Sequence, residues 1–161
     1  MTIGILFVCT ANLCRSPTAE GVFRSLAAKA GLADAFEVDS AGTGASHVGQ
    51  PPTQPAIDAA AARGYDITGI RARQITGEDI RHFDHVLAMT RGHLVEMRWL
   101  APRDLVDKPQ LLMSYAPPLG FLDIPDPYGG TADDYERAIG MIESATRGLL
   151  AKLTPDVRKA I

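Results

Sequence analysis

The sequence has little cysteine, no long hydrophobic run and no excess of positive charge. Its 161 residues contain two cysteines, Cys9 and Cys14, and a disulfide between thiols this close in sequence would stabilise the fold little. The N-terminus lacks the basic segment of a signal peptide, and no stretch approaches the ~18 apolar residues of a membrane-spanning helix. We therefore expect a cytoplasmic protein without a membrane partner, while secretion by a route without a signal peptide stays open.

Charge and motif content exclude further classes. The formal net charge is -3 and the basic residues are scattered, so nothing indicates a nucleic-acid partner. The sequence has no Walker-type Gly-Lys-Ser/Thr and no dinucleotide-binding fingerprint. Its four histidines do not form a convincing metal-ligand set with the cysteines: His47, His82, His85 and His93. We therefore expect neither a metal nor a cofactor.

Strand-like and helix-like patterns alternate along the chain, with no repeat or long linker to divide it. Strands are predicted at 3–8, 36–41, 85–89 and 111–114. Helices are predicted from 16, at 55–63, from 76, at 91–100 and from 131. These elements predict one domain over 1–161, of the α/β class: a three-layer α/β/α fold in which helices flank a central four-stranded parallel sheet. Ligands bind such sheets beyond the carboxyl ends of the strands, where the loop 9–15 falls.

Three helix starts carry local capping signals. Ser16 is predicted to be the N-cap of the first helix, with Pro17 at its first helical position. Capping boxes are predicted at two later starts: Thr76 with Asp79, and Thr131 with Asp134. Segments rich in glycine and proline are predicted to be loops: 42–54 and 115–130.

The segment Val8-Cys-Thr-Ala-Asn-Leu-Cys-Arg-Ser-Pro17 carries the chemistry, because it joins a buried strand to a helix start. A helix N-terminus offers unpaired N–H groups, and a loop in front of it can turn more of them toward an anion. Arg15 adds a planar set of donors that matches phosphate oxygens. We expect this positive field to favour the Cys9 thiolate, a nucleophile to which Ser16 can donate a hydrogen bond. Asn12 lies mid-loop, and asparagine tolerates positive φ.

This segment resembles the phosphate-binding loop of the low-molecular-weight protein tyrosine phosphatases, a cysteine, five residues, then Arg-Ser. The family's second hallmark, an Asp-Pro-Tyr near the C-terminus, is matched by Asp126-Pro127-Tyr128. Two segments between these hallmarks, 39–43 and 72–76, are also similar to family segments. The resemblance covers essentially the whole chain, and it implies a phosphotyrosine phosphatase I-like fold with flavodoxin-like winding.

The resemblance also implies residue roles. Cys9 would form a phosphocysteine, Arg15 would stabilise the phosphoryl oxygens, and Asp126 would act as general acid and then general base. The loop residues would bind the phosphate: Thr10, Ala11, Asn12, Leu13, Cys14 and Ser16. Asn12 and Ser40 would support the loop, Tyr128 and His47 would form walls of the cleft, and Cys14 would pair reversibly with an oxidised Cys9. The implied partners are a phosphotyrosine-containing protein or peptide and inorganic phosphate as product.

The sequence departs from the family pattern in two places, and alternative functions stay open. The stretch 44–48 lacks the aromatic residue that many members have, and Thr90 stands where an aspartate is common. An arsenate reductase of this fold uses further cysteines, which the chain does not have. Related protein-arginine phosphatases place threonine where this chain has Leu13, which favours phosphotyrosine. A phosphate-binding module without turnover is the remaining alternative, and the joint presence of Cys9, Arg15 and Asp126 argues against it.

Overall fold

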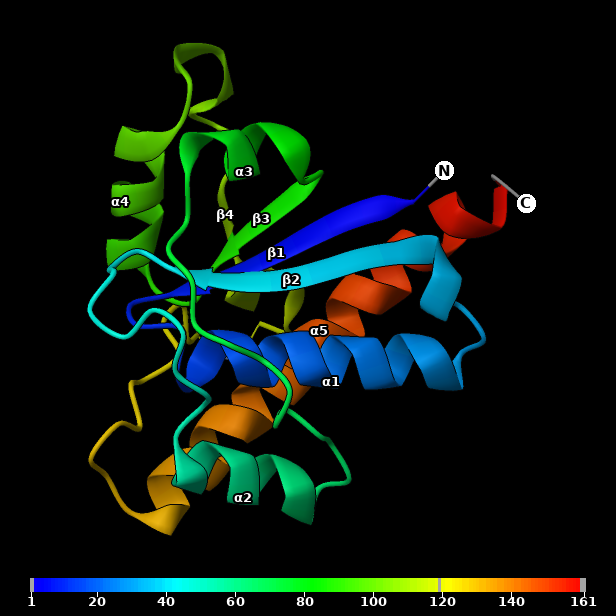
Figure 1. Cartoon of the computed structure of the whole chain (residues 1–161). Coiled ribbons are helices and arrows are strands. Elements are labelled where there is room, and N and C mark those ends of the chain that lie inside the picture. The colour runs from blue at the N-terminus through cyan, green and yellow to red at the C-terminus, as the bar shows by residue number, and fades with distance from the viewer. Residues whose placement is uncertain (1, 119, 160–161) are drawn as a thin grey trace.

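A computed structural model describes residues 2–118 and 120–159 and places a four-stranded parallel sheet at the centre of the fold (Figure 1). Its strand order is β2-β1-β3-β4. The strands have these bounds: β1 Ile3–Cys9, β2 Phe36–Gly42, β3 His85–Ala88 and β4 Gln110–Leu111. In the register, Ile5 lies opposite Val38 on one side and His85 on the other. The central strand β1 pairs on both edges, as its unbroken apolar run predicts.

Helices cover both faces of this sheet, which confirms the predicted three-layer α/β/α architecture. The helices have these bounds: α1 Arg15–Lys29, α2 Gln54–Ala62, α3 Gly77–His82, α4 Arg91–Leu100 and α5 Ala132–Lys159. Short 3-10 turns lie at Ala33–Ala35, Arg103–Leu105 and Leu112–Tyr115. Figure 1 shows α1 and α5 on one side of the sheet, α3 and α4 on the other, and α2 outside α1. No helix in the described ranges is both long and apolar enough to cross a membrane.

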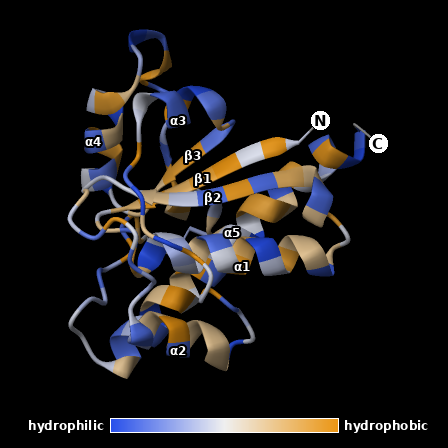
Figure 2. Ribbon diagram, viewed as in Figure 1, coloured by the Kyte–Doolittle hydropathy of each residue, from blue (hydrophilic) through white to orange (hydrophobic). Residues whose placement is uncertain are grey.

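Alternate residues of β1 build the two halves of the core. Phe7 points into the larger cluster with α1 and α5, and Leu6 points into the smaller one with α3 and α4. The ring of Phe23, on α1, lies 6.1 Å from Phe7 and 5.0 Å from Phe36 between centroids. Figure 2 shows the corresponding concentration of hydrophobic residues along the strands. Full burial of a large hydrophobic side chain stabilises the fold by roughly 2 kcal/mol, so these strands form a stable base for the site at their carboxyl ends.

Three local predictions are wrong and two are confirmed. Helix α1 begins at Arg15 with Cys14 as N-cap and no capping side chain, so Ser16 is not the N-cap and Pro17 is the third helical residue rather than the first. The fourth strand covers 110–111 rather than 111–114, because the chain turns into a 3-10 helix directly after its pairing with β3. The predicted capping boxes are present at the starts of α3 and α5. The predicted loop 115–130 includes residue 119 and the predicted domain includes 1, 160 and 161, which lie outside the described residues.

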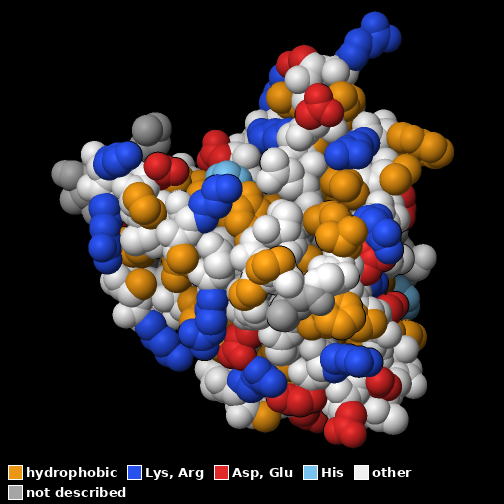
Figure 3. Space-filling view, turned by 180° about the vertical axis from the view of Figure 1, so that it is seen from behind, with side chains coloured by type: hydrophobic (Ala, Val, Ile, Leu, Met, Phe, Trp, Pro, Cys, Tyr) orange, Lys and Arg blue, Asp and Glu red, His pale blue; other side chains and the backbone are white. Residues whose placement is uncertain are grey.

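The surface mixes charges of both signs with isolated apolar side chains. Figure 3 shows lysine and arginine side chains interspersed with acidic and hydrophobic ones on the face seen from behind. Eight large hydrophobic residues are exposed in the described chain, among them Trp99 on α4 and Tyr128 beside the site described next. The basic side chains are thus scattered over this face, as they are scattered along the sequence.

Candidate active site

Four carbonyl groups of the loop that links β1 to α1 accept hydrogen bonds from backbone N–H groups outside the loop: Cys9 from Thr43 at 2.9 Å, Thr10 from Gly44 at 2.9 Å, Leu13 from Thr53 at 3.1 Å and Cys14 from Thr18 at 3.2 Å. Within the described chain, the N–H groups of residues 10–14 donate to no protein acceptor. Since these N–H groups also lie before an uncapped helix start, the loop forms a cup that can bind an anion.

Gly42, at the end of β2, permits the close approach on which this arrangement depends. A Cβ at this position would lie 2.5 Å from the carbonyl oxygen of Thr10 and 3.0 Å from the carbonyl carbon of Ala11. Both neighbours are backbone atoms, so a side chain here would push the loop away. The glycine therefore allows the segment after β2 to bind the first carbonyls of the cup.

The thiol of Cys9 lies buried at the floor of the cup. Its Sγ is 3.0 Å from Ser16 Oγ, close enough for a hydrogen bond in which either atom donates. Ser16 Oγ also accepts from Asn12 Nδ2 at 2.8 Å and contacts the carbonyl of Ala41 at 3.3 Å. When the sulfur is a thiolate, the Ser16 hydroxyl can turn its hydrogen toward it. Ser16 is the second residue of α1, so its hydroxyl lies beside the sulfur instead of capping the helix.

Asn12 shapes the middle of the cup from within the protein. It is fully buried and has φ of +58°, the left-handed conformation that asparagine tolerates. Its Nδ2 also donates to Ser40 Oγ at 3.0 Å, and its Oδ1 accepts from the backbone N–H of Arg73 at 3.1 Å. The expected hydrogen bond between Asn12 and Ser40 is thus present.

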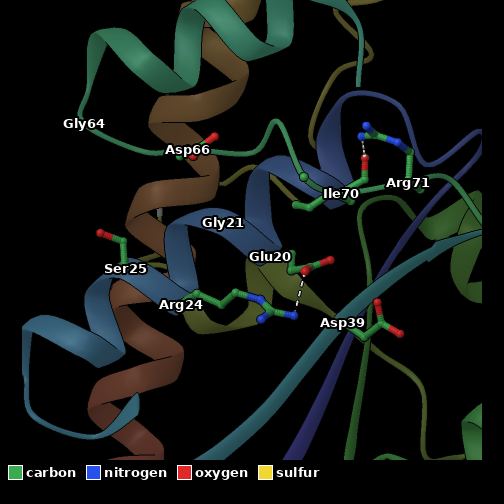
Figure 4. A pocket seen from close by; sticks show the side chains of 10 residues that line it. Glu20, Gly21, Arg24, Ser25, Asp39, Gly64, Asp66, Ile70 and Arg71 are labelled. Atoms are coloured by element: carbon green, nitrogen blue, oxygen red, sulfur yellow. Dashed lines mark hydrogen bonds and ion pairs between the residues drawn. The ribbon is translucent and has the colours of Figure 1, made fainter. Parts of the chain in front are cut away.

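A buried carboxylate continues this chain of hydrogen bonds away from the cup. Ser40 Oγ donates to Glu20 Oε1 at 2.7 Å, and the other oxygen of Glu20 pairs with Arg24 Nη2 at 2.8 Å. Burial raises the pKa of Glu20, although the contacts with Ser40 and Arg24 oppose this shift. Figure 4 shows Glu20 and Arg24 pairing at the wall of a hollow beside α1, with Asp39 nearby. The sequence analysis missed Glu20, because a glutamate on a helix is ordinarily a surface residue.

Arg15 connects the cup to the Asp-Pro-Tyr segment. Its side chain is 6% exposed, and its Nη1 donates to the carbonyl of Ile124 at 3.0 Å. Its Nη2 lies 3.7 Å from Asp126 Oδ2. Asp126 is in turn oriented by the N–H of Tyr128, which donates to its Oδ1 at 3.1 Å. Ile124, a further anchor that sequence analysis missed, also donates its N–H to the carbonyl of Met89.

These groups converge on one cleft of about 200 Å³. Its lining contains most of the predicted site residues: Cys9, Thr10, Ala11, Leu13, Cys14, Arg15, His47, Asp126 and Tyr128. The other predicted residues, Asn12, Ser16 and Ser40, lie buried behind the cup. His47 is held by a contact of 3.1 Å between its Nδ1 and Gln50 Oε1.

Cys14 lies on the side of the cup that faces α2 and α5. Its Sγ is 3.4 Å from Thr53 Oγ1 and 3.7 Å from the hydroxyl of Tyr135. Burial raises the pKa of the Cys14 thiol, against the opposing effect of these two hydroxyl contacts. Cys14 therefore holds its proton more firmly than an exposed cysteine does.

His93 is a buried neighbour of the cup that the sequence did not reveal. Its Nε2 is 2.7 Å from Thr10 Oγ1, and its Nδ1 is 3.0 Å from Thr90 Oγ1. Burial and the positive charge of Arg15 lower the pKa of His93 to about 4, although Asp126 and Asp123 oppose the shift. No local signal marks this role, and Thr90 only caps α4 and fixes the orientation of the first turn that carries His93.

The fold and this cleft define an α/β protein with a thiol at the floor of an anion-binding cup. A family model described as low molecular weight phosphotyrosine protein phosphatase matches residues 4–159. A Streptomyces coelicolor protein named low molecular weight protein-tyrosine-phosphatase is 44% identical over 164 residues, covering 98% of this chain and 97% of the relative. The human low molecular weight phosphotyrosine protein phosphatase is 35% identical over 153 residues, covering 94% and 96%.

A solved structure extends the likeness to three dimensions. The crystal structure of YfkJ from Bacillus subtilis matches with a TM-score of 0.91 and 34% identity, covering 97% of each chain. The chain belongs to the low molecular weight phosphotyrosine protein phosphatase family, and it is therefore a hydrolase.

Proposed function

We propose that the protein hydrolyses phosphotyrosine in proteins or peptides, and small aryl phosphates, through a phosphocysteine intermediate on Cys9. One observation carries the proposal: Cys9, Arg15 and Asp126 line the same cleft although Asp126 comes from a distant loop. The three groups supply a nucleophile, a cation for phosphoryl oxygens and a proton donor, which together suffice for phosphoryl transfer.

In the first step the Cys9 thiolate attacks phosphorus, the S–P bond forms and the P–O bond to the tyrosine ring breaks. Asp126, in its acid form, gives its proton to the departing phenolic oxygen. Arg15 and the N–H groups of the cup bind the phosphoryl oxygens, whose charge is spread over the transition state. The hydroxyl of Ser16 stabilises the sulfur when it carries negative charge.

In the second step water attacks phosphorus and the S–P bond breaks, releasing inorganic phosphate and the Cys9 thiolate. Asp126, now a carboxylate, takes the proton from that water and returns to its acid form. Atoms and protons therefore balance over the cycle without a cofactor or an external oxidant.

The apolar walls of the cleft favour an aromatic substrate. Ala11, Leu13 and Tyr128 line it next to the phosphate cup, so a phenyl ring has apolar surface to contact. Leu13 also stands where related arginine phosphatases have threonine, and a leucine offers no hydrogen bond to a guanidinium group. The cytoplasm stays the predicted location and 1–161 the predicted single domain; both free thiols suit a reducing compartment.

The test measures turnover of phosphotyrosyl, phosphoseryl and phosphoarginyl peptides side by side, with an arsenate-reduction assay in parallel. We expect metal-independent, vanadate-sensitive hydrolysis of phosphotyrosine and no turnover in Cys9→Ser. Asp126→Asn should be slower by about 100- to 10,000-fold on phosphotyrosine, and by less on aryl phosphates whose leaving group needs no proton. Asp133→Asn, which removes an equal charge from the exposed start of α5, is the matched control. Full activity in Cys9→Ser, or arsenate reduction in place of hydrolysis, would refute the proposal.

A further inference from the structure

The contact between His93 and Thr10 has no part in the reaction as described so far. His93 is 4% exposed and comes from the first turn of α4, on the opposite side of the sheet from α1. Its Nε2 reaches Thr10, the residue directly after the nucleophile and part of the cleft lining, at 2.7 Å. A buried imidazole thus joins a second helix to the phosphate cup.

The contacts of Thr90 indicate which atom donates in the hydrogen bond between His93 and Thr10. Thr90 Oγ1 accepts the backbone N–H of His93 at 3.2 Å and lies 3.0 Å from its Nδ1. The single hydroxyl hydrogen of Thr90 can therefore be donated to Nδ1. The hydrogen of the imidazole ring then sits on Nε2 and is donated to Thr10 Oγ1.

Each tautomer leaves one hydroxyl hydrogen without a protein acceptor among the described residues. With the hydrogen on Nδ1, Thr90 Oγ1 would accept twice, and the hydrogen left over would be that of Thr90, which is only partly exposed. With the hydrogen on Nε2, the one left over is that of Thr10, which is exposed and lines the cleft, where water or a substrate oxygen can accept it. Burial and Arg15 lower the pKa of His93 to about 4, while Asp126 and Asp123 act in the other direction. The donor sequence Thr90 to His93 to Thr10 therefore places the remaining hydrogen in the cleft.

We propose that His93 is a positioning residue of the phosphatase reaction: fixed by Thr90 as the Nε2–H tautomer, it donates to Thr10 and leaves the Thr10 hydroxyl hydrogen free to bind substrate oxygen in the cleft. The inference rests on the proposed function, because it assigns the hydroxyl to the same phosphoryl group that Cys9 attacks. Without the ring, Thr10 Oγ1 would lose the donor that orients it, and the start of the cup would lose an anchor.

The kinetics of single and double variants measure the coupling between His93 and Thr10. We expect His93→Leu and Thr10→Val each to lower kcat/KM for p-nitrophenyl phosphate about tenfold, the effect of one lost hydrogen bond. The double variant should be no slower than either single one, because both remove the same interaction. Thr10→Ser, which keeps the hydroxyl, and His93→Gln, which keeps a side-chain donor, should recover most of the activity. The matched control is His82→Leu: His82 lies at the end of α3 and forms an exposed pair with Glu37 of β2.

A nuclear magnetic resonance measurement separates this role from a merely structural one. The ring ¹⁵N shifts of His93 in the wild-type protein should show Nδ1 unprotonated and Nε2 protonated at pH 7, and Thr90→Val should lose this preference. A wild-type ring with its hydrogen on Nδ1, additive losses in the double variant, or normal kcat/KM in Thr10→Val would overturn the proposal. If His93→Leu does not fold, the wild-type tautomer and the Thr10→Val and Thr10→Ser pair still decide. Activity surviving in Cys9→Ser would instead refute the proposed function itself.

Discussion

Asn12 offers the sharpest test of how the cup is held, because its backbone and side chain contribute separately. Asn12→Ala removes three hydrogen bonds, to Ser16, Ser40 and Arg73, and places alanine at φ of +58°. Asn12→Gly removes the same bonds but relieves the backbone. Asn12→Asp tolerates the conformation and keeps the acceptor for Arg73, but it loses both donors.

The magnitudes follow from these differences. Three bonds at about 1 kcal/mol each predict a loss of about 3 kcal/mol in the free energy of unfolding for the alanine and glycine variants. Alanine adds about 1–2 kcal/mol of left-handed strain. Glycine adds about 0.5–1 kcal/mol through the greater freedom of its unfolded chain. Asn12→Gly should therefore be the more stable of the two, by up to about 1.5 kcal/mol.

Urea unfolding followed by far-ultraviolet circular dichroism measures stability, and p-nitrophenyl phosphate turnover measures activity. Because Asn12 holds Ser16 against the sulfur of Cys9, all three variants should lose activity even under conditions where they are fully folded. A loss below about 1 kcal/mol in Asn12→Ala would show that the network does not hold the cup, since even one buried bond contributes that much. Full activity in folded Asn12→Asp would show that its two donors are not needed.

Three further predictions concern neighbouring groups. Burial and Arg15 lower the pKa of His93 from 6.5 to about 4, so between these values the unfolded chain binds a proton that the folded chain does not. The free energy of unfolding should therefore fall by about 3 kcal/mol as pH drops from 6.5 to 4, and urea titrations of His93→Gln should lack this share of the fall. Cys14→Ser should keep turnover within a few-fold but should recover less activity with dithiothreitol after peroxide treatment. In the wild type the Cys14 thiol condenses with the Cys9 sulfenic acid to a disulfide and water, whereas in the variant a second peroxide oxidises the sulfenic acid to the sulfinic acid, which dithiothreitol does not reduce; recovery equal to wild type would contradict this role. Tyr128→Ala should raise KM for phosphotyrosyl peptides and leave the unfolding free energy within about 0.5 kcal/mol, since the side chain is 63% exposed; an unchanged KM would argue against its role as a cleft wall.

The features that were predicted correctly depend on interactions between residues that are close in sequence. The capping boxes at Thr76 and Thr131 were predictable because each box is completed within four residues. The apolar run of β1 likewise predicted a strand buried on both faces. Ser16 was misassigned because α1 begins one residue earlier, at Arg15, and the Ser16 hydroxyl contacts Cys9 and Asn12 instead of capping the helix.

Groups supplied by tertiary packing could not be predicted in the same way. His93 and Ile124 contact the cup only because α4 and the segment before Asp126 come to the same edge of the sheet. Nothing in the local sequence of either residue indicates this. Glu20 is similar: only the position of Ser40 beside α1 turns an ordinary helical glutamate into a buried partner of the cup.

The segment from Cys9 to Arg15 does not form a cup by its sequence alone. In a loop without outside contacts, the backbone N–H groups would donate to water or to the loop's own carbonyls. Here four of the loop's carbonyls already accept hydrogen bonds from donors outside the loop, and Asn12 holds the turn at positive φ. The N–H groups are thereby left facing an anion site before any substrate arrives. Donors held in this way need no reorganisation as charge develops on the phosphoryl oxygens, which is the condition under which they contribute most to the rate. The surrounding segments, among them those of Gly42 and Ile124, therefore hold the shape of the cup together with the loop itself.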